Sequence, residues 1–196
     1  MMSHQRTENT RSFHIGRGLL LAAAVSVALG CDLIPGEASG IGQFGVGAGP
    51  NNPSGTLAST RATGFHLEAT ARVTPPLSSL GAGADLAIYH FGERLPGQGS
   101  TNVAAATVHA TCNLMPGPIA PYLTGGLGIY HVTAPGGAAG NSSQTRPGIH
   151  VGAGVSLNVM RVRAFVEARY HSVHTASGEV SPATTRFVPV TIGILF

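Results

Sequence analysis

Six charged residues carry the strongest hint of chemistry in this sequence, because they lie on the polar side of segments in which apolar and polar residues alternate. They are Glu68, Arg72, Asp85, Arg163, Glu167 and Arg169. Groups of both signs could relay protons or ions, or they could form ion pairs that fill a closed interior. Buried charges must be paired whatever the protein does. The set therefore favours an ion-pair network inside the fold.

Histidine supplies the second candidate set, since imidazole binds metals and gains a charge below about pH 6.5. The residues are His66, His90, His131, His150, His171 and His174. Alternation puts His66, His150 and His171 on the polar face of their segments. It puts His90 and His131 on the apolar face. Because no short HxxxH spacing joins the set, the sequence predicts neither a metal site nor a cofactor.

A weak repeat joins histidine to tyrosine. Ile88-Tyr89-His90 recurs as Ile129-Tyr130-His131 and, more loosely, as Arg169-Tyr170-His171. Tyrosine is typical of a membrane boundary, where its ring lies in the apolar phase and its hydroxyl is hydrated. The repeat is therefore interpreted as hairpin periodicity with interfacial tyrosines.

A hydrolase would need a hydroxyl beside a base that a carboxylate orients. His171, Ser172 and Glu179 supply these three groups close together in the sequence. Neighbouring residues on a strand point to opposite faces, so His171 and Ser172 should not meet. The sequence therefore predicts no catalytic residue, and a lipid hydrolase is a minor alternative.

The first thirty residues have the pattern of an export signal. Arg11 and Arg17 precede an apolar run, Leu19 to Leu29, that is shorter than the roughly 20 residues of a membrane helix. Small residues before Cys31 predict cleavage there, which gives a signal peptide at 1–30, a short periplasmic segment at 31–40 and one domain at 41–196. Cys31 is also a possible lipidation site. The other cysteine, Cys112, falls on an apolar face and is expected to stay a thiol.

The composition argues against a water-soluble surface. Only 10% of the residues are charged, where a soluble domain carries about 25%, and 28 residues are glycine. The chain has no lysine, and Arg6, Arg11 and Arg17 all lie in the export signal. The remaining charge is nearly balanced, so nucleic acid is not an expected partner.

Eight segments alternate with a period of two and are separated by clusters of Gly, Pro, Asn and Ser. They predict strands at 41–49, 63–73, 79–91, 102–114, 119–132, 148–159, 163–174 and 186–196. Long connections (50–62, 92–101, 133–147 and 175–185) take turns with short ones (74–78, 115–118 and 160–162). This pattern is typical of an eight-stranded, antiparallel, up-and-down transmembrane β-barrel with its long loops outside the cell. An even strand number lets the sheet close, so that no backbone group is left unpaired in lipid.

From about residue 39 onward, the chain resembles the small outer-membrane β-barrel family that includes OmpA-type and OmpX-type barrels. The resemblance rests on the strand pattern and on the closing segment Phe187-Val188-Pro189-Val190-Thr191-Ile192-Gly193-Ile194-Leu195-Phe196. In that family, a terminal aromatic residue on a run of alternating apolar residues is the signal that the outer-membrane assembly machinery recognises. The resemblance therefore implies an all-β membrane barrel and assigns Phe196 to assembly.

Alternation alone does not separate an apolar-out membrane barrel from an apolar-in soluble barrel of the lipocalin kind. The polar face decides, because its few charges would coat a water-facing surface poorly but could neutralise one another in a narrow lumen. We therefore expect a filled lumen and a structural or surface-interaction role for exposed loops, whose ligand the sequence does not name. The expected partners are outer-membrane lipid and the assembly machinery. A narrow pore, a lipid A-modifying hydrolase and a soluble barrel are the alternatives.

Overall fold

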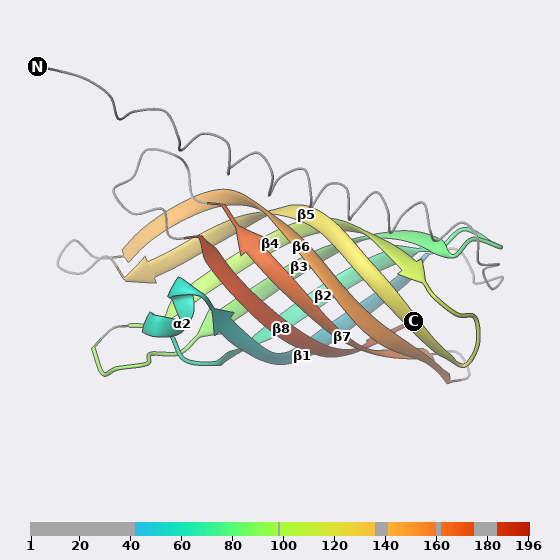
Figure 1. Ribbon diagram of the computed structural model, residues 1–196, viewed down its shortest axis with the longest axis horizontal. Coiled ribbons are helices and arrows are strands. Elements are labelled where there is room, and N and C mark those ends of the chain that lie inside the picture. The colour runs from blue at the N-terminus through green and yellow to red at the C-terminus, as the bar shows by residue number, and fades with distance from the viewer. Residues whose placement is uncertain (1–41, 98, 136–140, 160–161, 175–183) are drawn as a thin grey trace, which may run out of the picture.

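Eight antiparallel strands close into a barrel in the computed structural model (Figure 1). The structure describes residues 42–97, 99–135, 141–159, 162–174 and 184–196. Each strand pairs with its neighbours in the sequence, and β1 pairs with β8 to close the sheet. The predicted eight-stranded up-and-down barrel is therefore confirmed. The predicted signal peptide and the segment at 31–40 lie outside the described residues.

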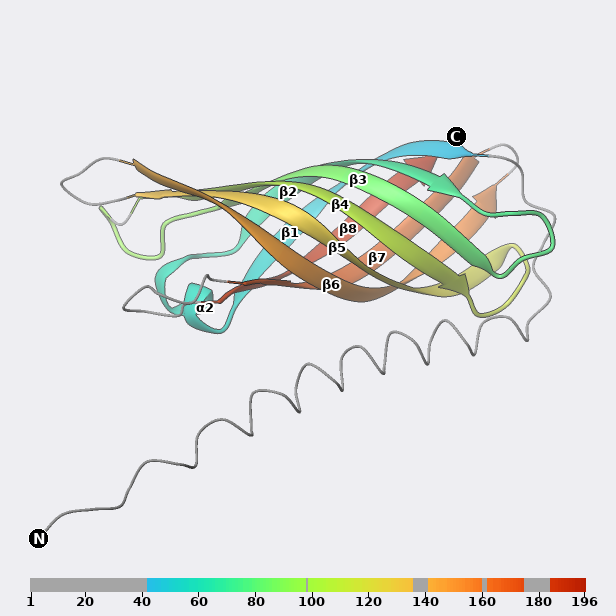
Figure 2. The same cartoon turned by 90° about the horizontal axis from the view of Figure 1, so that it is seen from above.

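The strands are β1 (Gln43–Ser54), β2 (Gly64–Val73), β3 (Leu80–Phe91), β4 (Thr101–Asn113), β5 (Ile119–Pro135), β6 (Asn141–Val159), β7 (Val162–Val173) and β8 (Thr185–Leu195). A short helix, α2 (Thr56–Thr60), lies in the connection between β1 and β2. Figures 1 and 2 place the C-terminus at one end of the barrel and α2 at the other. Among the described residues, no helix is long and apolar enough to cross a membrane.

Five strands begin and end within one residue of prediction, but β1, β5 and β6 run further toward the α2 end. β1 continues through the predicted loop at 50–62 as far as Ser54. β5 and β6 pair as far as Pro135 and Asn141, so most of the predicted loop at 133–147 is hairpin. Apolar alternation stops earlier than backbone pairing does, because polar residues such as Ser142 and Ser143 can still pair their backbones in water.

Apolar side chains face outward and charged side chains face inward, which is the reverse of a soluble barrel. On the outer surface Leu86 and Ile192 are 66% and 64% exposed, whereas the inward Glu167 and Arg169 are 1% and 2% exposed. In a soluble barrel of this size the apolar side chains fill the interior instead. The predicted orientation, with the apolar face outward, is therefore confirmed.

The narrow interior is packed by inward rings that cover inward glycines on the adjacent strand. Tyr122 pairs with Gly154, and a Cβ atom on that glycine would lie 2.6 Å from the ring. Phe165 covers Gly193 in the same way. Eight strands leave an interior just wide enough for side chains to fill, so a large ring needs a small neighbour. Inward glycines thus make room for the aromatic residues.

Cys112 is not the free thiol that the sequence predicts. It lies on the outward side of β4, as predicted, yet it is 5% exposed and disulfide-bonded. The expected thiol is therefore wrong, because an apolar position does not distinguish a thiol from the disulfide that an exported chain can form. The other cysteine, Cys31, lies outside the described residues. Its lipidation stays a prediction and excludes Cys31 as the partner in that disulfide, because a thioether sulfur cannot also form an S–S bond.

Replacing Gly193 with alanine should destabilise the barrel by about 1–3 kcal/mol, because the new methyl group would overlap the Phe165 ring. The control is Gly125→Ala, whose Cβ would have the His150 carbonyl oxygen as its nearest neighbour at 3.8 Å. It should change the free energy of unfolding by less than about 0.5 kcal/mol. Urea titration, followed by the gel migration of unheated samples, measures both variants. Equal stability of the two would contradict the proposed packing of rings on glycines.

Candidate functional site in the barrel interior

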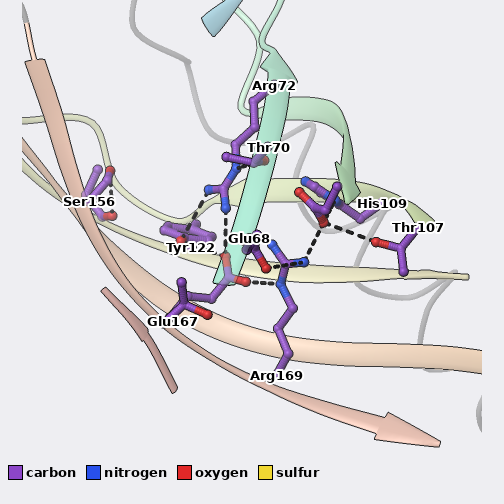
Figure 3. A network of polar contacts seen from close by, with 12 residues as sticks. Glu68, Thr70, Arg72, Thr107, His109, Tyr122, Ser156, Glu167 and Arg169 are labelled. Carbon is purple, nitrogen blue, oxygen red and sulfur yellow. Dashed lines mark hydrogen bonds and ion pairs between the residues drawn. The ribbon is translucent and has the colours of Figure 1, made fainter. Parts of the chain in front are cut away.

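Five of the six predicted charged residues come together inside the barrel (Figure 3). Glu68 and Arg72 project from β2, Asp85 from β3, and Glu167 and Arg169 from β7. Residues an even number of positions apart on a strand point to the same face, so alternation sends both members of each pair into the lumen. The network therefore links one side of the barrel to the opposite side.

Arg169 is the centre of this network. Its Nη1 donates to Asp85 Oδ2 at 2.5 Å and lies 3.8 Å from Glu68 Oε2. Its Nε donates to Glu167 Oε1 on the same strand. A guanidinium group suits this position because it stays charged and offers five N–H donors in one plane. One side chain thus contacts all three lumen carboxylates.

Glu167 is held by two further partners. Tyr122 donates its hydroxyl to Glu167 Oε2 at 2.7 Å, and Arg72 Nη2 donates to the same oxygen at 3.2 Å. The Arg72 guanidinium also lies over the Phe165 ring, 4.7 Å from its centroid. A carboxylate this deeply buried is stable only with such charged and hydroxyl partners.

His109 is a member of the site that the sequence patterns do not single out. Its Nδ1 lies 2.9 Å from Asp85 Oδ2, and the imidazole is buried. The imidazole is therefore a further polar partner for the Asp85 carboxylate, beside Arg169. Its inward parity on β4 is visible in the sequence. Its position along the barrel axis, next to Asp85, depends on the register of β3 with β4, which the alternation does not specify.

Arg163 does not join the other five charged residues in the middle of the barrel. It lies near the β6–β7 turn, where its Nε donates to Asn158 Oδ1 at 2.7 Å. Asn158 is its register partner on β6. The prediction used parity alone, and parity says nothing about how far along the barrel axis a residue lies. The grouping of Arg163 with the central network is therefore corrected.

A second interior cluster, which we call the aromatic plug, fills the lumen toward α2. Its rings are Tyr89, Phe91, Tyr130 and Phe187, each at most 1% exposed, and Leu57 of α2 packs against the cluster. Tyr89 and Phe187 have their ring centroids 4.9 Å apart. The interfacial position expected for Tyr89 and Tyr130 is therefore wrong. Tyr89 shares the parity of Asp85, so alternation itself places it inward.

The histidines divide between the two faces as alternation predicts. His66, His150 and His171 are buried in the lumen, while His131 is exposed and His90 is partly exposed on the outside. The His171 ring stacks on Phe187 at 4.8 Å, and its Nδ1 lies 2.9 Å from the Tyr130 hydroxyl. Within the described ranges, no group of three or more His, Cys, Asp or Glu side chains could hold a metal ion.

The three groups proposed for a hydrolase do not assemble. His171 points into the lumen, whereas Ser172 lies on the outer face between Ile149 and Arg186. Glu179 lies outside the described residues. The predicted separation of His171 from Ser172 is therefore confirmed. The interior groups that do meet form the ion-pair network and the aromatic plug, which together fill the lumen.

Comparisons with known proteins agree with this architecture. No protein-family model matches the sequence, and no curated protein matches it. Neisserial surface protein A, from Neisseria, has a solved structure that is 19% identical, with 79% of this chain and 95% of that chain covered and a TM-score of 0.63. The N-terminal β-barrel domain of Pseudomonas aeruginosa OprF is 12% identical over 79% and 97% of the two chains, with a TM-score of 0.48. Ail, the attachment invasion locus protein of Yersinia pestis, is 15% identical over 79% and 99%, also with a TM-score of 0.48. The first of these likenesses shows that the chain has the fold of a small eight-stranded barrel.

Replacing Arg169 with methionine should destabilise the barrel by about 3–5 kcal/mol, because it leaves three buried carboxylates with one guanidinium. Adding Asp85→Asn should recover part of the loss by removing one of those carboxylates. Arg94→Gln, in the exposed connection between β3 and β4, is the control and should change stability by less than about 0.5 kcal/mol. Urea titration of these three variants and of the unaltered barrel measures the differences in the free energy of unfolding. A loss for Arg169→Met no larger than that of the control would contradict the central role of Arg169.

Proposed function

We propose that this chain is an integral protein of a bacterial outer membrane, of structural or surface-interaction type, with a filled lumen and exposed loops. The observation that carries the proposal is the apolar outer surface of a closed barrel. Large apolar side chains more than half exposed lie on nearly every strand, among them Val46, Leu67, Ile88, Val108, Ile129, Val151 and Ile192. Such a continuous surface would cause aggregation in water but is required in lipid.

The barrel dimensions and connections support the same proposal. A tilted strand of about 9–11 residues crosses a membrane, and even the shortest strand, β2, has 10 residues. The connections between β2 and β3, between β4 and β5 and between β6 and β7 lie at the end where β1 starts and β8 finishes. The longer connections 55–63, which contains α2, and 92–100 lie at the other end (Figure 2). Outer-membrane barrels place their short turns in the periplasm and their long loops outside. The α2 end is therefore assigned to the cell exterior.

The interior supports a role that is neither transport nor catalysis. The aromatic plug and the ion-pair network both fill the lumen, which weighs against the narrow pore. The separation of His171 from Ser172 weighs against the hydrolase. A protein named as a surface protein has the same fold, which fits an interaction role for the loops. The ligand of those loops stays open in this proposal.

Membrane fractionation combined with heat-modifiable gel migration tests the location. The full chain, expressed in a Gram-negative host, should be found in the outer-membrane fraction and should migrate differently before and after heating, because a folded barrel resists detergent until it is heated. Recovery in the soluble periplasmic fraction without a migration shift would refute the proposal.

Planar-bilayer recording separates the closed barrel from the pore. The purified full chain should give no reproducible open level, because Tyr89, Tyr130 and Phe187 fill the lumen above the ion-pair network. A steady, repeatable conductance step would favour the narrow pore instead.

Removal of Phe196 should sharply lower the amount of folded barrel in the outer membrane, because the terminal aromatic residue is proposed to be read by the assembly machinery. Phe44→Ala is the matched control. Phe44 lies beside Phe196 and is equally exposed, at 64% against 63%, and the two backbones exchange hydrogen bonds at 3.1 and 2.8 Å. Quantifying the heat-modifiable band measures assembly. Equal losses in the two variants would argue against a specific signal at the C-terminus.

A further inference from the structure

The Ile-Tyr-His repeat has a defined arrangement at the α2 end of the barrel. In both copies the isoleucine is outward and exposed, at 63% for Ile88 and 61% for Ile129. The tyrosine points inward and belongs to the aromatic plug. The histidine, His90 or His131, points outward again. On both strands the histidine is thus the first outward residue beyond the apolar surface.

Both histidine rings are fixed by a polar residue on the next strand. His90 Nδ1 lies 2.7 Å from Asn102 Oδ1, and His131 Nδ1 lies 3.0 Å from Thr145 Oγ1. Because Asn102 Oδ1 is an acceptor, the Nδ1 of His90 is the donor in that bond. The other ring nitrogen, Nε2, then becomes a donor only when the ring is protonated. The same arrangement occurs on two hairpins, β3–β4 and β5–β6.

Arg186 occupies the equivalent place on β8. It is exposed and follows the outward Val188 in the direction of α2. Its register partners are Ser54 on β1 and Ser172 on β7. Among the described residues, the outer faces of the strands carry no carboxylate: Glu68, Asp85 and Glu167 point into the lumen, and Glu93 lies in the connection between β3 and β4. The charge at this edge is therefore basic and is not neutralised by an acidic neighbour on the strands.

Few aromatic residues accompany this basic edge. Outer-membrane barrels flank their apolar band with aromatic residues at both boundaries. The chain has no tryptophan, and of its four tyrosines Tyr89, Tyr122 and Tyr130 point into the lumen, while Tyr170 on β7 faces outward and is 38% exposed. At the opposite end of the barrel, Phe44 and Phe196 do face outward. The aromatic residue nearest to His90 on the outer face is Phe65, whose ring lies 5.3 Å away.

We propose that His90, His131 and Arg186 form an outer basic girdle that binds the phosphate groups of lipid headgroups at the outer boundary of the membrane. This inference rests on the proposed membrane location. Arginine and protonated histidine donate charge-assisted hydrogen bonds to phosphate oxygens, and phosphate monoesters, the most highly charged headgroup phosphates, are the preferred ligands. The girdle holds the barrel at a fixed depth, as aromatic residues do in other barrels.

Lipid selectivity measured with spin-labelled lipids tests the girdle. The full-length refolded barrel is placed in phosphatidylcholine vesicles that contain spin-labelled phosphatidic acid, a phosphate monoester, or spin-labelled phosphatidylcholine. At pH 5.5 phosphatidic acid should be preferred about fivefold at the barrel surface, the effect of one basic charge at an anionic interface. In the variant that combines His90→Asn, His131→Asn and Arg186→Gln, the preference should fall to about one. Arg94→Gln, which removes a basic charge from an exposed connection, should keep the preference.

The outcomes separate the girdle from the membrane location. A barrel that folds in the vesicles without preferring phosphatidic acid would overturn the girdle and leave the membrane proposal standing. A preference that survives in the triple variant, or that disappears equally in Arg94→Gln, would also overturn the girdle. Failure to fold into any vesicle would overturn the membrane location and the girdle with it.

Discussion

The pairing of β1 with β8 is the constraint on which the rest of this structure depends. It gives every strand two neighbours, so the sheet has no edge with unpaired N–H and C=O groups. Closure after eight strands also makes the interior narrow. Side chains inside must then fit the space and pair their charges, which explains why rings lie over glycines and why Arg169 contacts every lumen carboxylate. The outer surface, by contrast, is left to apolar side chains.

A lumen filled in this way restricts what the protein can do. The ion pairs of Arg169 span the barrel from β7 to β2 and β3, and the aromatic plug packs beneath α2. Opening the lumen would separate buried charges from their partners, which costs several kcal/mol for each broken pair. Function is therefore expected on the outside of the barrel: on the connections at the α2 end and, as proposed, along the basic girdle.

The sequence alone predicts most of the fold, because a closed sheet imposes a period of two that each strand repeats. It also predicts which face each lumen charge occupies. It does not predict height along the barrel axis, which depends on strand register. Parity alone groups Arg163 with Arg169, yet Arg163 lies near the β6–β7 turn, and parity does not single out His109, which lies beside Asp85. The residue type of Tyr89 favours the membrane boundary, whereas its parity predicts the inward position that the structure shows.

The central claim is that the apolar face of the sheet contacts lipid and the polar face does not. The chain has no tryptophan, so a single one can report on each face. Ile129 and Tyr130 are adjacent on β5, with exposures of 61% and 0%. In vesicles of lipids brominated on their acyl chains, Ile129→Trp should be strongly quenched and Tyr130→Trp hardly at all. Equal quenching, stronger quenching of Tyr130→Trp, or no quenching of either variant would contradict the account.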